Sequence, residues 1–357
     1  MADTQIQLDE KIKNDRFNNL WKENFKTNRT NKEFDKQIRR GINFVKTKIT
    51  NSKIQTSCYV VNPGPSLEKN ITILKEIKKK LNPIIITSDV CLYRLLDEGI
   101  VPDCVCTIDP ADSVKRFWEG YQEQTKKIIL FAPTTCAPSA IQFWKGPIVF
   151  FNQRDKYKWR DDFFLKLTKY TKTYGAFLNL AFVGATLLQV ASILNAREIF
   201  LVGWDFSSDE EGNMYCKGFM EKRIFTNITK EDLETDPRFK QEDHTEIKKE
   251  LTEGNWDKGV ELFKKKLAEE LNDQAKKLKI KHKTKDVILW TGQHYLLYKN
   301  IFLKTIHANC RRAIFNCTEG GILTEIPCEA LEDSVKYIGH RDVDLLKTLF
   351  PHYAGIM

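Results

Sequence analysis

The chain has 357 residues, of which 41% are hydrophobic and 29% are charged, and its formal net charge is +9. That length suits one large domain or two domains of ordinary size, and the composition is typical of a globular protein. No apolar run approaches the roughly 20 residues that cross a bilayer, and the polar first residues lack the layout of a signal peptide. We therefore expect a cytoplasmic protein without a membrane span.

Two further features of the composition exclude common function classes. Lysines alternate with glutamates in stretches such as Lys75–Lys80, which is typical of solvated helix faces, so we expect no nucleic-acid partner. The nine cysteines include no Cys-x-x-Cys pair, and several lie in apolar runs. An odd count without secretory context indicates buried, reduced thiols rather than disulfides or a structural zinc site.

The first half of the chain predicts helices followed by a parallel sheet. Residues 1–50 are polar, with apolar positions near helical spacing, and they predict two amphipathic helices in an N-terminal extension. Short apolar runs then alternate with helix-like segments. The predicted strands are 58–61, 84–86 and 105–108, and the predicted helices are 67–81 and 91–96. Such a βαβαβ series indicates a parallel sheet.

The second half continues this pattern before it becomes strongly charged. Apolar runs predict strands at 128–131, 148–151 and 198–202 and a helix at 182–194. Apolar positions from Val260 to Leu278 predict a long amphipathic helix. We therefore predict an α/β fold with a Rossmann-like, mostly parallel sheet flanked by helices. The Rossmann-like domain covers 51–250, and a helical C-terminal region at 251–357 completes it.

The first candidate site is the segment Asn62-Pro-Gly-Pro-Ser66, which lies between a strand and a helix. Gly64 permits a sharp turn and a close approach to a ligand, and Ser66 is a suitable N-cap for the helix. The free N–H groups and the dipole of such a helix start attract an anion, so we predict phosphate binding. The alternative is that Pro63-Gly-Pro65 is only a rigid turn.

Acidic residues follow the next two predicted strands. Asp89 comes after the strand at 84–86, and Asp109 comes after the strand at 105–108. Since the carboxyl ends of parallel strands share one edge of a sheet, these carboxylates could bind ribose, a base or Mg²⁺ there. The alternatives are helix N-capping by Asp89 and a solvent-facing turn at Asp109.

A third group follows the buried strand at 198–202. Gly203-Trp-Asp205 stands at the strand end, and Gly212 would let the loop fold Tyr215 back over the same edge. The phenol of Tyr215 could then donate a hydrogen bond to a phosphate, or the residue could be an ordinary surface aromatic. Gly184, near the start of the preceding helix, is more often a packing glycine than a ligand contact.

One histidine is a candidate proton shuttle. His244 lies between acidic residues that would raise its pKa, and histidine is the usual general base near neutral pH. It is equally a polar residue in a charged loop. The chain has no Gly-x-x-x-x-Gly-Lys-Ser/Thr loop, no Gly-x-Ser-x-Gly elbow and no His-Glu-x-x-His motif.

Four segments in this order resemble the MptE-like family, which includes archaeal 6-hydroxymethylpterin diphosphokinase and the bacterial motility accessory factor (Maf) glycosyltransferases. The segments are Tyr59–Leu67, Ile100–Pro110, Phe182–Gly184 and Ile199–Phe206. In addition, Asn316–Gly321 resembles a Maf-type Asn-Ala-Thr-Glu-Gly-Gly segment. Bacterial sialyltransferases have a related layout, with Gly-Pro-Ser-Leu after the first strand and Gly-x-Asp-Phe after a later one.

The resemblance implies roles for individual residues. It implies that Gly64 to Ser66 contact a donor phosphate or ribose, that Asp89 and Asp109 stand where sialyltransferases use asparagines, and that Tyr215 binds phosphate. Maf-like proteins tend to have histidine at the position of Tyr215, and Asn62-Pro63 replaces the usual Gly-x. The full set of expected nucleotide-binding residues is Asn62, Gly64, Pro65, Ser66, Asp89, Asp109, Gly184, Gly203, Asp205, Thr318 and Glu319, with Tyr215 and His244 as catalytic residues.

Three functions are compatible with these residues. The first is a Maf-like glycosyltransferase that moves a nonulosonic, sialic-acid-like sugar from a CMP donor to a protein or glycan hydroxyl, without a required metal. The second is an ATP-dependent 6-hydroxymethylpterin diphosphokinase, in which Mg²⁺ would bind Asp89, Asp109 or Asp205. The third is a non-catalytic nucleotide-binding module. The segment Thr318-Glu319-Gly-Gly and the long flanking regions favour the first.

Overall fold

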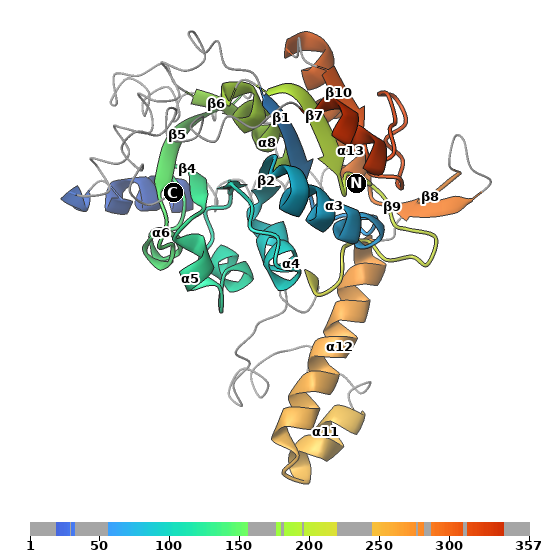
Figure 1. Cartoon of the computed structure of the whole chain (residues 1–357). Coiled ribbons are helices and arrows are strands. Elements are labelled where there is room, and N and C mark those ends of the chain that lie inside the picture. The colour runs from blue at the N-terminus through green and yellow to red at the C-terminus, as the bar shows by residue number, and fades with distance from the viewer. Residues whose placement is uncertain are drawn as a thin grey trace, which may run out of the picture.

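The computed structural model of the chain describes residues 19–28, 30–32, 56–155, 176–179, 182–194, 196–219, 245–275, 278–281, 287–309 and 313–338. Its centre is an eight-stranded sheet in the order β10-β7-β1-β2-β3-β4-β5-β6, in which every neighbouring pair is parallel. Figure 1 shows this sheet with helices packed around it. The predicted α/β fold with a parallel sheet is therefore confirmed.

Six strands of the sheet lie at the predicted apolar runs, whereas the strands at 176–179 and 313–316 were not predicted. The strands of the sheet are β1 (Thr56–Val61), β2 (Ile84–Ser88), β3 (Cys104–Cys106), β4 (Ile129–Pro133), β5 (Ile148–Asp155), β6 (Ala176–Asn179), β7 (Ala196–Val202) and β10 (Ala313–Asn316). A separate antiparallel pair consists of β8 (Leu278–Lys281) and β9 (Ile288–Thr291). The predicted long helix ends before this pair, so the expectation that Leu278 is helical is wrong.

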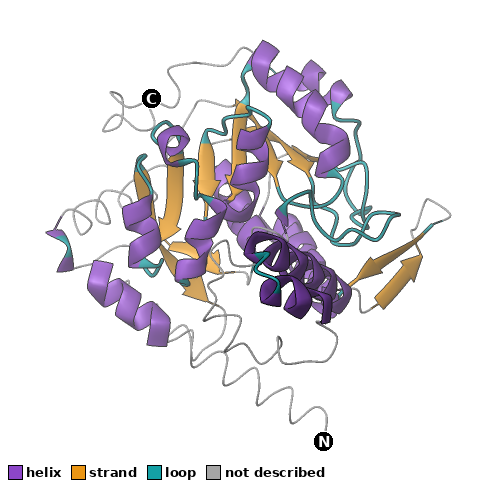
Figure 2. Cartoon of the chain, turned by 90° about the horizontal axis from the view of Figure 1, so that it is seen from below, coloured by secondary structure: helices purple, strands orange, loops and turns teal. Residues whose placement is uncertain are grey.

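Helices cover both faces of the sheet, as Figure 2 shows from below. They are α3 (Leu67–Leu81), α4 (Leu92–Asp97), α5 (Gln122–Thr125), α6 (Pro138–Phe143), α8 (Val183–Ile193), α11 (Thr245–Thr252), α12 (Trp256–Ala275) and α13 (Gln293–Asn309). The described part of the chain also contains the short 3₁₀ turns η1 (Asp89–Cys91), η2 (Asp112–Phe117) and η5 (Glu332–Tyr337).

Alternating side chains of the strands divide the core into two layers. Tyr59 and Val61 of β1 pack in one cluster with the buried faces of α3, α4 and α6. Cys58 and Val60 point to the other cluster, which contains residues of α8 and α13. Burial on both faces explains why the strands read as continuous apolar runs, because neither face of the sheet meets water.

The strand order reverses between β1 and β7. From β1 the chain adds β2 to β6 along one direction, and then returns to place β7 on the other side of β1. In open parallel sheets, ligands bind in the crevice at the carboxyl ends of the strands where the order reverses in this way. Here those ends are followed by Asn62-Pro-Gly-Pro-Ser66 and by Gly203-Trp-Asp205.

The described part of the N-terminal extension contacts the end of the sheet. Residues 19–28 are helical, and the amide of Asn24 donates to the carbonyls of Pro110 and Thr135 at 2.8 and 3.1 Å. The amide of Asn28 likewise donates to the carbonyls of Thr134 and Cys136, at 3.1 and 3.0 Å. This helix, the unlabelled violet-blue one at the left of Figure 1, thus contacts the loops that follow β3 and β4.

The region 251–357, which was predicted to be helical, also contributes strands. Its strand β10 pairs with β7 and forms one edge of the large sheet, while α11 and α12 pack on each other and project away from the body in Figure 1. The predicted boundary at residue 250 falls inside α11. The division of the chain into domains stays a prediction. None of the described helices is long and apolar enough to cross a membrane.

The described cysteines are free thiols. Seven of them are buried, as the apolar runs predict, whereas Cys328 is exposed.

Candidate functional site

A pocket opens where the strand order reverses, between the loops that follow β1 and β7. Its volume is about 180 Å³, whereas a second pocket on the other side of Asp205 measures about 20 Å³ and has room for about one water molecule. The walls of the larger pocket come from both loops, from the start of α8 and from the first turns of α13. We therefore take the larger pocket as the candidate ligand site.

The structure brings together some of the predicted residues and leaves others apart. The larger pocket is lined by the predicted residues Asn62, Gly64, Gly184, Gly203, Asp205 and Tyr215. Ser66 lines the small pocket, again with Asp205. The described residues Pro65, Asp89, Asp109, Thr318 and Glu319 line neither pocket. His244 lies outside the described residues, so its role as a base stays a prediction.

The loops after β1 and β7 are fastened to each other by their backbones. Asn62 N–H donates to Val202 O at 2.9 Å, and Gly64 N–H donates to Gly203 O at 3.1 Å. The contact between Gly64 and Gly203 requires glycine at both positions. Gly203 has φ +72°, and a Cβ on Gly64 would lie 2.0 Å from Asp205 Oδ2. The two glycines thus permit the approach that forms the floor of the site.

The start of α3 is not a free anion site, contrary to the sequence-based expectation. Ser66 makes no side-chain capping bond to the helix, and its Oγ instead donates to Asp205 Oδ2 at 2.8 Å. The backbone N–H groups of Leu67 and Glu68 donate to the carbonyls of Gly64 and Pro65. The carboxyl group of Asp205 therefore lies where a phosphate was expected. A contact of Gly64 to Ser66 with a donor stays a prediction.

Asp205 is a buried carboxyl group whose pKa is raised. It is 2% exposed, and desolvation raises its pKa to about 7, although the hydrogen bonds from Ser66 act in the opposite direction. Its Oδ1 has no hydrogen-bond partner among the described residues. A buried acceptor without a partner costs free energy, and a ligand N–H or O–H would satisfy it.

The start of α8 forms the anion-attracting side of the pocket. Phe182, Val183 and Gly184 line the pocket at the N-terminus of this 11-residue helix. The N–H groups of its first turn have no partner within the helix, and the helix dipole places partial positive charge there. Gly184 is also a packing residue, because a Cβ would lie 2.6 Å from the Phe182 ring. The sequence predicted this helix and placed Gly184 near its start, but it did not indicate that the helix start could bind an anion.

Another part of the pocket lining is aromatic. The ring of Tyr215 stacks on Phe219, with centroids 3.9 Å apart, and its hydroxyl group hydrogen-bonds the hydroxyl of Tyr295 on α13. Tyr298, one turn further, stacks on Phe182 at 5.0 Å. Sequence reasoning missed both α13 tyrosines. Their i, i+3 spacing, which places them on one face of a helix, is the signal that could have found them.

Asp89 and Asp109 form a separate acidic pair at the ends of β2 and β3. Thr107 connects them, since its hydroxyl donates to Asp89 and accepts the N–H of Asp109 at 3.3 Å. Desolvation and, to a smaller extent, the charge of Asp109 raise the pKa of Asp89 to about 7, although the hydrogen bond from Thr107 acts in the opposite direction. Asp109 accepts the N–H of Ala111 at 2.8 Å in a local turn, as the alternative supposed, but it is half-buried rather than solvent-facing.

Thr318 and Glu319 do not line the pocket but form hydrogen bonds with residues around it. The hydroxyl of Thr318 accepts the N–H of Trp204 at 3.1 Å, and its carbonyl accepts the Asn70 amide at 2.9 Å. Glu319 accepts the N–H of Leu331 at 2.7 Å. The bond to Trp204 holds the loop after β7 in place. A direct contact of either residue with a nucleotide stays a prediction.

Metal-ligating groups do not cluster in the part of the chain that the structure describes. Within these ranges, no three His, Cys, Asp or Glu residues are arranged to hold a metal ion. In the sheet, β1 separates Asp205, after β7, from Asp89, after β2. Two strand spacings amount to roughly 10 Å, so these carboxylates do not converge on one ion. A magnesium ion would therefore bind one or two of them together with substrate phosphates.

Comparison with known proteins agrees with this architecture. The model of a family described as 6-hydroxymethylpterin diphosphokinase MptE-like matches residues 25–211, more than half of the chain. The solved structure of the MAf glycosyltransferase from Magnetospirillum magneticum AMB-1 is similar in fold, with a TM-score of 0.51 and 12% sequence identity. That similarity covers 89% of this chain but 42% of the other, so this chain spans less than half of that protein's length. No curated protein matches the sequence.

Proposed function

Because the chain belongs to the MptE-like family, we propose that it is a nucleotide-dependent transferase of the Maf-like glycosyltransferase kind. It transfers a nonulosonic, sialic-acid-like sugar from a CMP donor to a hydroxyl group of a protein or glycan. The observation that carries this proposal is the pocket at the reversal of strand order, which is lined by the start of α8 and by aromatic side chains. Such crevices are the usual ligand sites of open parallel sheets.

The proposed roles follow from the groups that line the pocket. The N–H groups at the start of α8 hold the donor phosphate, because no lysine or arginine is among the described lining residues. The hydroxyl of Tyr215 donates a further hydrogen bond. As the bond from sugar to phosphate breaks, negative charge grows on the leaving CMP, and these fixed donors stabilise it. The aromatic rings supply flat apolar surfaces for the base or the sugar.

The acceptor hydroxyl must lose a proton during transfer. Asp205 lines the pocket and has a pKa near 7, so its carboxyl group can form a hydrogen bond with the bound donor. The base that takes the acceptor proton is proposed to be His244. Glycosyl transfer by this route requires no metal ion.

The family description favours a second candidate, an ATP-dependent 6-hydroxymethylpterin diphosphokinase. Mg²⁺ would then bridge the ATP phosphates and bind Asp89, Asp109 or Asp205. This reaction differs from the first in its donor and in its dependence on magnesium.

A melting-temperature panel separates these candidates. The purified protein is heated with CMP, UDP, GDP, ATP or AMP, each with and without Mg²⁺, because a ligand that binds only the folded state raises the melting temperature. A metal-independent shift with CMP supports glycosyl transfer, and a shift only with ATP and Mg²⁺ supports the diphosphokinase. Binding without sugar transfer would indicate a non-catalytic module, and no shift with any nucleotide contradicts the proposal.

Matched tyrosine variants sharpen this panel. Tyr215→Phe removes a hydroxyl that faces Tyr295 in the pocket, whereas Tyr121→Phe removes a hydroxyl that bonds Asp97 outside it. The proposal predicts that the shift with CMP shrinks in the first variant and persists in the second. Gly64→Val is unsuitable here, since its side chain would collide with Asp205 and unfold the floor of the site.

A further inference from the structure

One wall of the pocket comes from residues 214–219, which follow β7. Met214, Tyr215 and Phe219 line the pocket; Met214 and Tyr215 lie in an irregular stretch, and Phe219 is a helical residue at its end. Neither a strand nor a helix includes Met214 or Tyr215. The stacked rings of Tyr215 and Phe219 nevertheless have a defined geometry, with an interplanar angle of 10°. Contacts from elsewhere must therefore fix the backbone between them.

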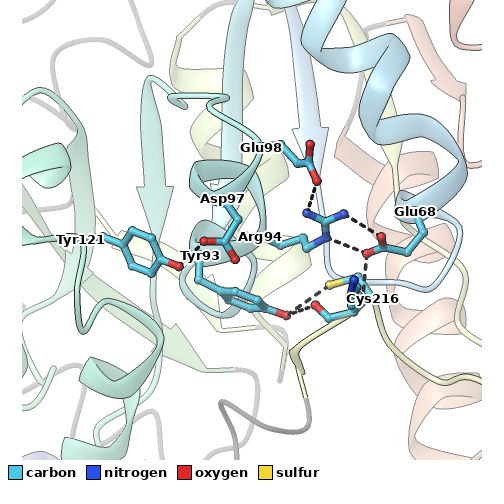
Figure 3. Close-up of polar contacts among 8 residues, drawn as sticks. Glu68, Tyr93, Arg94, Asp97, Glu98, Tyr121 and Cys216 are labelled. Carbon is cyan, nitrogen blue, oxygen red and sulfur yellow. Dashed lines mark hydrogen bonds and ion pairs between the residues drawn. The ribbon is translucent and has the colours of Figure 1, made fainter.

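These contacts converge on the peptide of Lys217. Its N–H donates to Glu68 Oε1 at 2.9 Å, and its carbonyl accepts the hydroxyl of Tyr93 at 2.7 Å. One residue earlier, the N–H of Cys216 donates to Pro63 O at 2.9 Å. Figure 3 shows Glu68 and Tyr93 reaching this segment from α3 and α4. The segment is thus held on three sides by groups from the first half of the sheet.

Arg94 in turn fixes Glu68. Its Nε and terminal nitrogen bind the two carboxylate oxygens of Glu68 at 2.8 and 2.7 Å, and its remaining nitrogen binds Glu98 at 2.7 Å. Such a bidentate pair has little freedom to rotate. Burial opposes ionisation of Glu68, but the hydrogen bonds from Arg94 and from Lys217 N–H keep its pKa below the ordinary value. Glu68 is therefore a charged, fixed acceptor for the Lys217 N–H.

We propose that Glu68, Tyr93 and Arg94 are positioning residues that hold the Tyr215–Phe219 wall against the bound donor, although none of the three lines the pocket. This inference rests on the proposed function in one respect, namely that the wall contacts the donor. The three residues form a clamp between α3, α4 and the Lys217 peptide. Opening the clamp loosens the wall and weakens binding while the sheet stays folded.

The chain offers two matched controls for this clamp. Glu68 and Glu98 both pair with Arg94, and their side chains are 33% and 34% exposed, but only Glu68 also accepts the Lys217 N–H. Likewise, Tyr93 and Tyr121 each donate one hydroxyl hydrogen bond, and only that of Tyr93 reaches Lys217. Glu68→Ala is therefore compared with Glu98→Ala, and Tyr93→Phe with Tyr121→Phe.

Two readouts are measured on the full chain. The first is hydrogen exchange of the backbone amides at 214–219, which needs no ligand. The second is the affinity for CMP, measured by calorimetry. We expect Glu68→Ala and Tyr93→Phe to speed this exchange by about tenfold and to weaken CMP binding by a similar factor, as for the loss of a partly buried hydrogen bond. Glu98→Ala and Tyr121→Phe should leave both values within about twofold.

The outcomes separate the clamp from the proposed function. Equal exchange rates at 214–219 in the test and control variants would overturn the clamp, whatever happens to CMP. Faster exchange with unchanged CMP affinity would show that the wall does not contact this nucleotide, and would equally overturn the positioning role. If the unmodified protein does not bind CMP, the proposed donor is wrong, and the exchange comparison still decides whether the clamp holds the wall. Because Tyr93→Phe removes a single hydroxyl, it keeps the test available if Glu68→Ala fails to fold.

Discussion

The hydroxyl of Ser66 donates a 2.8 Å hydrogen bond to Asp205 Oδ2, and this contact joins the loop after β1 to the loop after β7. The backbone N–H of Ser66 faces the same oxygen at 3.4 Å. The chain therefore places one of its own carboxyl groups at the start of α3. The start of α8 also lines the pocket, and the proposed phosphate site lies there.

Asp205 makes stability depend on pH. Its pKa is about 7 in the folded chain and about 3.9 in an unfolded one. Between these values the folded state holds a proton that the unfolded state releases, so the stabilisation is complete below about pH 4 and is lost as the pH rises towards 7. The variant Asp205→Asn lacks this titration. Relative to that variant, wild type should lose roughly 2 kcal/mol in free energy of unfolding between about pH 5 and about pH 8.

Urea unfolding of both proteins across this pH range measures the difference directly. Asn is nearly isosteric with Asp and can still accept the Ser66 hydrogen bond, so the comparison isolates the proton. A difference that does not change with pH, or one that grows in favour of wild type as the pH rises, would mean that Asp205 is ionised in the folded protein.

Gly64 is required for the approach of the two loops. In Gly64→Ala, the new Cβ would lie 2.0 Å from Asp205 Oδ2 and 2.5 Å from Gly203 O, so the floor of the site must move. We expect a loss of about 3 kcal/mol or more in free energy of unfolding. Gly99→Ala is the control, because Gly99 has φ +74° but no atom within 4 Å of the added Cβ. Its backbone strain alone costs about 1–2 kcal/mol. Denaturant unfolding of both variants tests the prediction, which fails if Gly99→Ala is the more damaging change.

The N-terminal helix is held to the sheet by a side-chain amide. Asn28 is fully buried, and its Nδ2 donates to the carbonyls of Thr134 and Cys136. The variant Asn28→Ala leaves both carbonyls without this partner and should lower the free energy of unfolding by about 1–3 kcal/mol. In Thr30→Ala, an exposed hydroxyl that bonds Thr27 O is lost, and the change should stay within about 0.5 kcal/mol. Equal effects in urea unfolding would show that the helix is not docked through Asn28.

The sequence predicted the layered fold because its signals are local. Each buried strand is a short apolar run, and α3 begins and ends at the predicted residues, Leu67 and Leu81. The error at Leu278 also has a local cause. One apolar residue at helical spacing does not reveal that the chain has already left α12 for the β8–β9 pair.

The candidate site was predicted only in part because it is assembled from distant segments. Gly64, Gly203 and Asp205 each follow the end of a predicted strand. Since the carboxyl ends of parallel strands share one edge, the sequence correctly predicted that these residues lie close together. The side-chain bond between Ser66 and Asp205 spans 139 residues, and no pattern around Ser66 distinguishes it from an ordinary N-cap. Tyr295 reaches Tyr215 from a helix 80 residues later, and this depends on how α13 packs.

A crystal structure of the protein with CMP tests the central claim most directly. We predict that the nucleotide lies between the loops after β1 and β7, with its phosphate within hydrogen-bonding distance of the N–H groups at Gly184 and Ala185, and that the binding persists without Mg²⁺. A nucleotide bound instead over Asp89 and Asp109, away from Asp205 and the start of α8, would contradict the account.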